Sequence, residues 1–165
     1  MTLRGVVRTF MLSGCAIATG CGVSASATGL TPAFVQAARD AHNYLKSDLI
    51  PRIGTPGFST TLAAARAKTK LLEAKMANDT DKGVWLILTM AIVKTREMSS
   101  MGELTAVMDG PSAEVQAATR DVAAERDQCM TEAEGWLSGS ASRVAALNAG
   151  PCLQQSRRAA AILGR

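Results

Sequence analysis

The chain has 165 residues, which is enough for one ordinary domain but too few for two. Hydrophobic residues make up 47% of the chain and aromatic residues only 4%, which excludes general disorder and favours helices over sheets. The formal net charge is only +4, with both signs interspersed, so we expect no nucleic-acid partner.

The first twenty residues have the three-part pattern of a secretory signal. Arg4 and Arg8 give a basic start, and residues 9–20 are uncharged and mostly apolar or small. Removing these two positive charges from the total of +4 leaves +2 for the rest of the chain. The run is too short and too polar for a stable membrane span, which needs about 20 mostly apolar residues. We expect residues 1–20 to direct export, 21–30 to form a flexible tether, and 31–165 to fold as one domain.

Two short motifs bear on how the signal is processed. The segments Leu12–Cys15 and Ala18–Cys21 both resemble the lipobox of bacterial exported lipoproteins. The resemblance covers only the N-terminal segment, and it implies a lipid-modified cysteine that anchors the protein to a membrane, facing the periplasm or the exterior. Cys21 fits better than Cys15, because a longer uncharged run precedes it. Cleavage after Ala27, which would release a soluble periplasmic or secreted protein, and an uncleaved anchor remain alternatives.

Two helices are expected in the first half of the domain. Thr31 and Pro32 form a typical helix start, and Pro51 should end that helix. Its expected inner face is apolar: Phe34, Ala37, Ala38, Ala41, Leu45 and Leu49. After a turn at residues 54–57, Ser59 or Thr60 should cap the second helix. The expected inner face of this helix is Leu62, Ala63, Ala67, Leu71, Ala74 and Met76.

The third helix is expected to begin near Asp81, after the polar segment 78–81. Residues 84–93 are apolar on almost every side, so we expect this segment to be the central and most buried element, with Trp85 or its neighbours packed against the fourth helix. A strand is the competing interpretation, but no other segment offers a partner strand. The apolar pattern continues through Met98, Met101, Leu104 and Met108, with Gly102 as a possible break.

The fourth helix should start at Ser112 and end near residues 138–140. Its expected inner stripe is Val115, Ala118, Val122, Cys129, Ala133 and Trp136. Further helical pieces are expected at residues 142–148 and from Pro151 to Leu163. The chain is therefore predicted to be an all-α bundle of four main helices plus short C-terminal helical pieces.

Two of the four cysteines, Cys129 and Cys152, lie in the predicted domain. In an oxidising compartment such a pair most often forms a structural disulfide. It would close a loop of about 24 residues and stabilise the fold by roughly 3 kcal/mol. The sequence therefore predicts that the fourth helix is covalently joined to the C-terminal segment.

Few residues offer catalytic or metal-binding chemistry. His42 is the only histidine, and we expect it to be exposed on a helix or hydrogen-bonded to its surroundings rather than to act as a base. Methionines are soft ligands that can bind copper(I), but core packing is the commoner use. The methionines concerned are Met90, Met98, Met101 and Met108. We predict no catalytic residue, no metal and no cofactor.

The sequence favours a non-enzymatic helical module of the cell envelope. It would bind an envelope protein or polymer, or serve a structural role. One alternative is a carrier of a small apolar ligand, with a cavity lined by Trp85, Met90 and Trp136. Another is an envelope hydrolase in which Asp and Glu residues that are distant in sequence converge.

Overall fold

The computed structural model describes residues 29–107, 110–139, 150–152 and 154. This part of the chain contains four α-helices and no strand, which confirms the all-α bundle and excludes the strand at residues 84–93. The helices are α1 (Pro32–Tyr44), α2 (Phe58–Glu73), α3 (Asp79–Val107) and α4 (Ala113–Ser138). None of these helices is long and apolar enough to cross a membrane.

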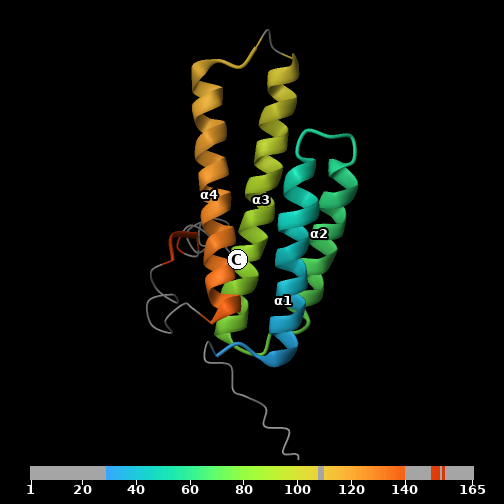
Figure 1. Ribbon diagram of the computed structural model, residues 1–165, viewed down its shortest axis with the longest axis vertical. Helices are drawn as coiled ribbons and strands as arrows, with labels where there is room; N and C mark the ends of the chain where they lie inside the picture. Colours follow the sequence, from blue (N-terminus) through green and yellow to red (C-terminus); the bar gives the residue numbers. More distant parts are fainter. Residues whose placement is uncertain (1–28, 108–109, 140–149, 153, 155–165) are drawn as a thin grey trace, which may run out of the picture.

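The four helices run alternately up and down, and they differ greatly in length (Figure 1). α3 and α4 have 29 and 26 residues, whereas α1 and α2 have 13 and 16. At 1.5 Å per residue, α3 is about 43 Å long and α2 about 24 Å long. The α3–α4 hairpin consequently projects beyond the α1–α2 pair at the end where α3 joins α4 (Figure 1).

The first helix begins at Pro32, as expected, but Thr31 does not cap it with its side chain. The Thr31 hydroxyl instead donates to Asp81 in α3. Before Pro51, the chain widens into the π-helix Leu45–Leu49 and then forms the 3-10 turn Ile50–Arg52. Proline cannot donate a main-chain hydrogen bond, so the regular helix ends before it. The core extends one residue into the expected tether, because Leu30 is buried.

The predicted inner face of α2 is wrong at most positions. Ala63, Ala67, Leu71 and Ala74 are exposed, and of the predicted set only Leu62 is buried. The observed inner face is Phe58, Thr61, Leu62, Ala65, Thr69 and Leu72. The helix starts at Phe58 with Gly57 before it, so Ser59 and Thr60 lie in the first turn and do not cap it. Because α2 has small or apolar residues on two opposite sides, periodicity alone does not identify the buried side.

The central role expected for residues 84–93 is only partly correct. Val84, Ile87, Leu88, Ala91 and Ile92 are buried, and Leu88 is 0% exposed. However, Val93 is 43% exposed, because three neighbouring helices cover only part of the circumference of α3. Trp85 faces α2, since its indole nitrogen donates to the Thr69 carbonyl at 3.1 Å. The helix continues through Gly102 without a break.

The fourth helix has the expected boundaries. The Ser112 hydroxyl accepts from the Val115 nitrogen, and the helix ends at Ser138, followed by Gly139 in the left-handed conformation. Its C-terminal half carries the buried residues Arg126, Cys129, Met130, Ala133, Trp136 and Leu137. Upstream, Ala118 is exposed and Val122 half-buried, so the predicted stripe is buried only from Cys129 onward. The expected pieces at 142–148 and after residue 154 lie outside the described residues, while residues 151, 152 and 154 are helical.

Candidate functional site

The projecting half of the α3–α4 hairpin has no core of its own. Ser99 is the last buried residue of α3 and Arg126 the first of α4, so no described residue between 100 and 125 is buried. Met101, Val115 and Val122 are only half-covered, and Leu104 is 63% exposed. Helices gain stability mainly by burying an apolar face, so this hairpin leaves apolar surface that a partner could cover.

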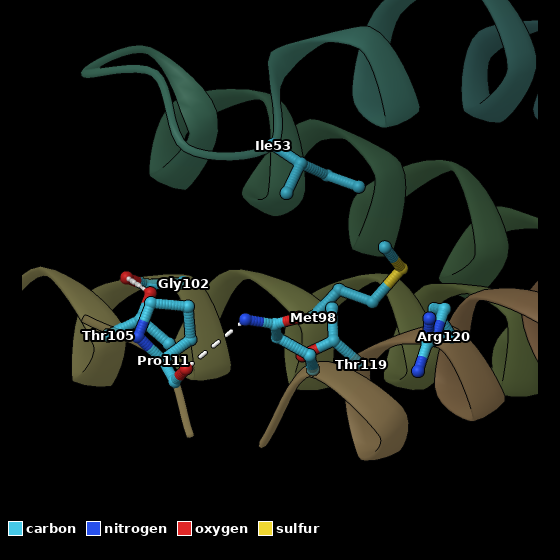
Figure 2. A pocket seen from close by; sticks show the side chains of 8 residues that line it. Ile53, Met98, Gly102, Thr105, Pro111, Thr119 and Arg120 are labelled. Carbon is cyan, nitrogen blue, oxygen red and sulfur yellow. Dashed lines mark hydrogen bonds between the residues drawn. The ribbon is translucent and has the colours of Figure 1, made fainter. Parts of the chain in front are cut away.

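An open groove lies at the base of this projecting half. It has a volume of about 460 Å³ and is lined by Ile53, Met98, Gly102, Thr105, Pro111, Gln116, Thr119 and Arg120. Ile53 reaches into it from the connection between α1 and α2, and Met98 extends toward Ile53 from α3 (Figure 2). The groove therefore exists because α1 and α2 stop short of the hairpin tip.

The polar groups of the groove wall are already engaged within the chain. The Thr105 hydroxyl donates to the Gly102 carbonyl at 2.8 Å, and the Thr119 hydroxyl donates to the Val115 carbonyl at 2.7 Å. The Gln116 amide donates to the Pro111 carbonyl at 3.2 Å. What remains available is apolar surface and one charged group, Arg120. The residues that line the groove include no His, Cys, Asp or Glu, so the groove suits apolar side chains better than acid–base chemistry.

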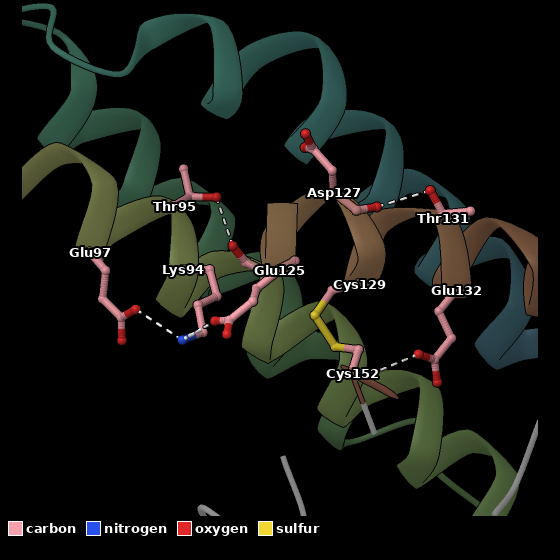
Figure 3. Close-up of a disulfide and its surroundings, with 10 residues drawn as sticks. Lys94, Thr95, Glu97, Glu125, Asp127, Cys129, Thr131, Glu132 and Cys152 are labelled. Carbon is pink, nitrogen blue, oxygen red and sulfur yellow. Dashed lines mark hydrogen bonds and ion pairs between the residues drawn. A yellow bond between two sulfur atoms is a disulfide. The ribbon is translucent and has the colours of Figure 1, made fainter. Parts of the chain in front are cut away.

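Polar contacts hold α3 against α4 next to the groove, on the side away from the hairpin tip. Lys94 lies between Glu97 and Glu125, with N···O distances of 3.1 Å and 2.8 Å (Figure 3). Burial lowers the pKa of Lys94, but hydrogen bonds to Glu125 and Glu97 outweigh this effect, so its pKa lies above the ordinary value. Arg126 is buried, bonds to Asp127 at 2.7 Å, and places one guanidinium nitrogen 3.0 Å from the Met98 sulfur. The Met98 side chain in the groove wall is thus held in place by Arg126.

A second hollow, of about 310 Å³, lies between α1 and α4 and contains His42. The His42 side chain is buried, and its Nε2 lies 3.2 Å from the Met130 carbonyl oxygen. A carbonyl oxygen only accepts, so His42 donates there, and it ties α1 to α4. Of the two predicted environments for His42, exposed or hydrogen-bonded, the structure shows the hydrogen-bonded one. The carboxylates in this hollow are largely exposed, at 63% for Asp127 and 61% for Glu134.

The fully buried carboxylate, Asp81, joins α1 to the start of α3. Its Oδ1 accepts from the Thr31 nitrogen at 3.1 Å. Its Oδ2 accepts from the Thr31 hydroxyl and the Ala77 nitrogen, both at 3.0 Å. The Asn78 side chain in turn caps the Asp81 nitrogen. The polar run at residues 78–81 predicted only a helix start, and nothing in it indicated that Asp81 would be buried and bonded to Thr31.

The predicted disulfide between Cys129 and Cys152 is present, with α-carbons 5.1 Å apart (Figure 3). Beside it, the Glu132 carboxylate accepts from the Cys152 nitrogen at 3.1 Å. A side chain at Gly150 would collide with the Glu132 carboxylate, so any larger residue there would require the Glu132 side chain to move. The described start of the C-terminal segment is therefore fixed to α4 by one covalent bond and one hydrogen bond.

The other candidate residues are not brought together. No group of three or more His, Cys, Asp or Glu residues able to hold a metal occurs in the described part of the chain. The sulfur atoms of Met98 and Met101 contact Arg126 and Thr119 respectively, and Met108 lies outside the described residues. Trp85, Met90 and Trp136 line neither hollow. Cys15, Cys21 and Ala27 also lie outside the described residues.

Comparisons with known proteins add no relative: no family model, no curated protein and no solved structure matches this chain.

Proposed function

We propose that the protein is a non-enzymatic helical module of the cell envelope that binds another protein through the groove on its α3–α4 hairpin. The observation that carries this proposal is that none of the residues described between 100 and 125 is buried, in a hairpin that projects from an otherwise well-packed bundle. Helical segments with partly covered apolar faces commonly complete their packing on a partner.

The groove favours an apolar helix or loop as its ligand. Its polar side chains are engaged within the chain, so a hydrogen-bonding ligand would find few free groups apart from Arg120. Met98, with Met101 close by on the same helix, supplies a thioether side chain that adapts to differently shaped partners. An open groove also suits a macromolecule better than a small apolar ligand, which is normally enclosed.

Gly102 offers a sharp test of the groove. No atom lies within 4 Å of a Cβ built at this position, so a side chain can be introduced there without a clash at its first atom. Gly102→Trp should fill the groove, whereas Gly102→Ala changes helix propensity without filling it. A photo-reactive residue at Thr105 should cross-link a specific partner in native envelope preparations, and mass spectrometry would identify that partner.

The cross-link should disappear in Gly102→Trp and persist in Gly102→Ala. A probe at Asn43, exposed on α1, is the positional control and should capture nothing specific. Equal capture from Thr105 and Asn43, or unchanged capture in Gly102→Trp, would contradict the proposal.

The envelope location in this proposal rests on the N-terminal signal pattern and on lipid attachment at Cys21. Support comes from the uncharged run that ends at Gly20 and from the domain disulfide, which suits an oxidising compartment. Cys21→Ser should abolish fatty-acid labelling and move the protein from the membrane fraction to the soluble envelope fraction. Labelling that is lost in Cys15→Ser instead would select the other motif. No effect of either change would favour cleavage after Ala27.

A further inference from the structure

The outward side of α2 carries small and apolar residues between two rows of basic residues. At 3.6 residues per turn, positions 63, 67, 71 and 74 share one side of the helix, and all four are exposed. Leu71, the largest of them, is 65% exposed. Exposed Arg66 and Lys70 flank this stripe on one side and half-buried Lys68 on the other, and exposed Lys75 follows just after the end of α2. We refer to these eight residues as the α2 outer face.

The positive charge of this face is largely uncompensated. α2 contains Arg66, Lys68 and Lys70 against one acidic residue, the exposed Glu73 at its last position, so the helix keeps a net positive charge. Among the described residues, no ion pair involves Arg66, Lys70 or Lys75. The Lys68 ammonium lies 5.1 Å from the centre of the Tyr44 ring, a contact that holds the side chain without neutralising it.

We infer that the α2 outer face lies against an anionic lipid bilayer. Its basic side chains would contact lipid phosphates, while Leu71 and the exposed alanines would face the boundary with the acyl chains. Clusters of four or more Lys and Arg residues on an amphipathic helix are typical of surfaces that recognise anionic lipids. α2 is also the outermost helix of the bundle on its side, so nothing in the described fold covers this face (Figure 1).

The apolar centre of the face distinguishes a bilayer from other anionic partners. A soluble polyanion would be bound by the basic residues alone and would gain nothing from Leu71. Neither hollow described above is lined by α2, so no groove marks this face as the seat of a docked helix or peptide. The inference involves neither the α3–α4 groove nor a lipid on Cys21, so its test is independent of the test of the proposed function.

Vesicle binding of the full chain tests this inference. A Cys15→Ser and Cys21→Ser background removes any attached lipid, and the vesicles contain phosphatidylcholine with or without phosphatidylglycerol. Each basic side chain at an anionic surface contributes about fivefold to the partition coefficient, so Arg66→Gln with Lys70→Gln should weaken binding to anionic vesicles about 25-fold. Lys46→Gln with Arg96→Gln, two exposed positions outside the α2 outer face, makes the same change in net charge and should have much less effect. An equal loss in this control pair would show that only net charge matters and would overturn the inference.

A second measurement reports which side of the molecule meets the lipid, even if the N-terminal segment also binds. An environment-sensitive label on Ala67→Cys, in the middle of the face, should shift to blue emission with anionic vesicles. A label on Ala118→Cys, exposed on α4, should not shift. A shift at position 118 instead, or at neither position, would refute the inference. If soluble polyglutamate shifts the label at position 67 as strongly as vesicles do, the face is a polyanion site and not a bilayer contact.

Discussion

Replacing Asp81 by Asn should weaken the fold more than any other isosteric change of a charged side chain at the start of α3. Asp81 is 0% exposed and accepts three hydrogen bonds from two other segments. The amide of Asn has nearly the same shape, but it replaces one acceptor oxygen with a donor. The variant therefore tests the hydrogen bonds of Asp81 while leaving its volume unchanged.

The expected loss follows from which donor is left unpaired. If the Asn oxygen takes the place of Oδ1, its NH₂ group opposes the Ala77 N–H; in the reverse orientation it opposes the Thr31 N–H. Leaving one such partly buried donor without an acceptor costs about 1–3 kcal/mol, and the remaining bonds lose the contribution of the charge. We expect Asp81→Asn to lower the free energy of unfolding by about 2–4 kcal/mol.

Urea denaturation followed by circular dichroism would measure this loss, with Asp79→Asn as the matched control. Asp79 is exposed in the same first turn of α3, so its replacement removes only the favourable charge at the helix N-terminus, worth about 0.3–1 kcal/mol. If Asp81→Asn costs no more than Asp79→Asn at an unchanged denaturant slope, the link between α1 and α3 does not stabilise the fold and the reasoning fails.

Three further predictions concern the core, the disulfide and Lys94. Leu88→Ala should cost about 2–5 kcal/mol in urea denaturation, whereas Leu104→Ala, at a position 63% exposed, should cost less than about 1 kcal/mol; similar losses would contradict the burial seen here. Cys152→Ser should lower the unfolding free energy by about 3 kcal/mol without reductant, and adding reductant should abolish the difference from the unsubstituted protein. Lys94→Gln should cost about 0.5–1 kcal/mol at neutral pH. Because the folded pKa of Lys94 is raised, this difference should hold from neutral pH up to pH 10.5 and decline as the pH rises through the folded value, so a difference that already disappears between about pH 7 and pH 10 would contradict it.

The boundaries of most elements could be predicted because local chemistry sets them. Pro32, Ser112 and Gly139 mark helix ends through missing donors, a capping hydroxyl and a left-handed backbone, and each acts within a few residues. The disulfide was also predictable, because elimination left only two cysteines for the domain.

Which side of each helix is buried was harder to predict, because that depends on packing between distant segments. α2 offers Ala63, Ala67 and Leu71 on one side and Leu62, Ala65 and Leu72 on the other, and only contacts with α1 and α3 decide between them. The groove depends on the unequal lengths of the two helix pairs, and Ile53 enters it from a connection with no periodic pattern. No local signal identifies such a residue.

The distribution of buried residues along the hairpin links stability to function. The contacts that fix the fold lie at one end: Asp81 joins α1 to α3, Cys129 joins α4 to the C-terminal segment, and the buried part of α3 ends at Ser99. Segments with little buried surface open at low free-energy cost, so the distal hairpin can adjust to a partner while the rest of the bundle stays folded. The exposed residues that line the groove can also change with little loss of stability: Gly102, Pro111, Gln116 and Arg120. A bundle that needed its longest helices only for its own core would have no use for their uncovered distal turns, and this is the physical reason to look for a partner there.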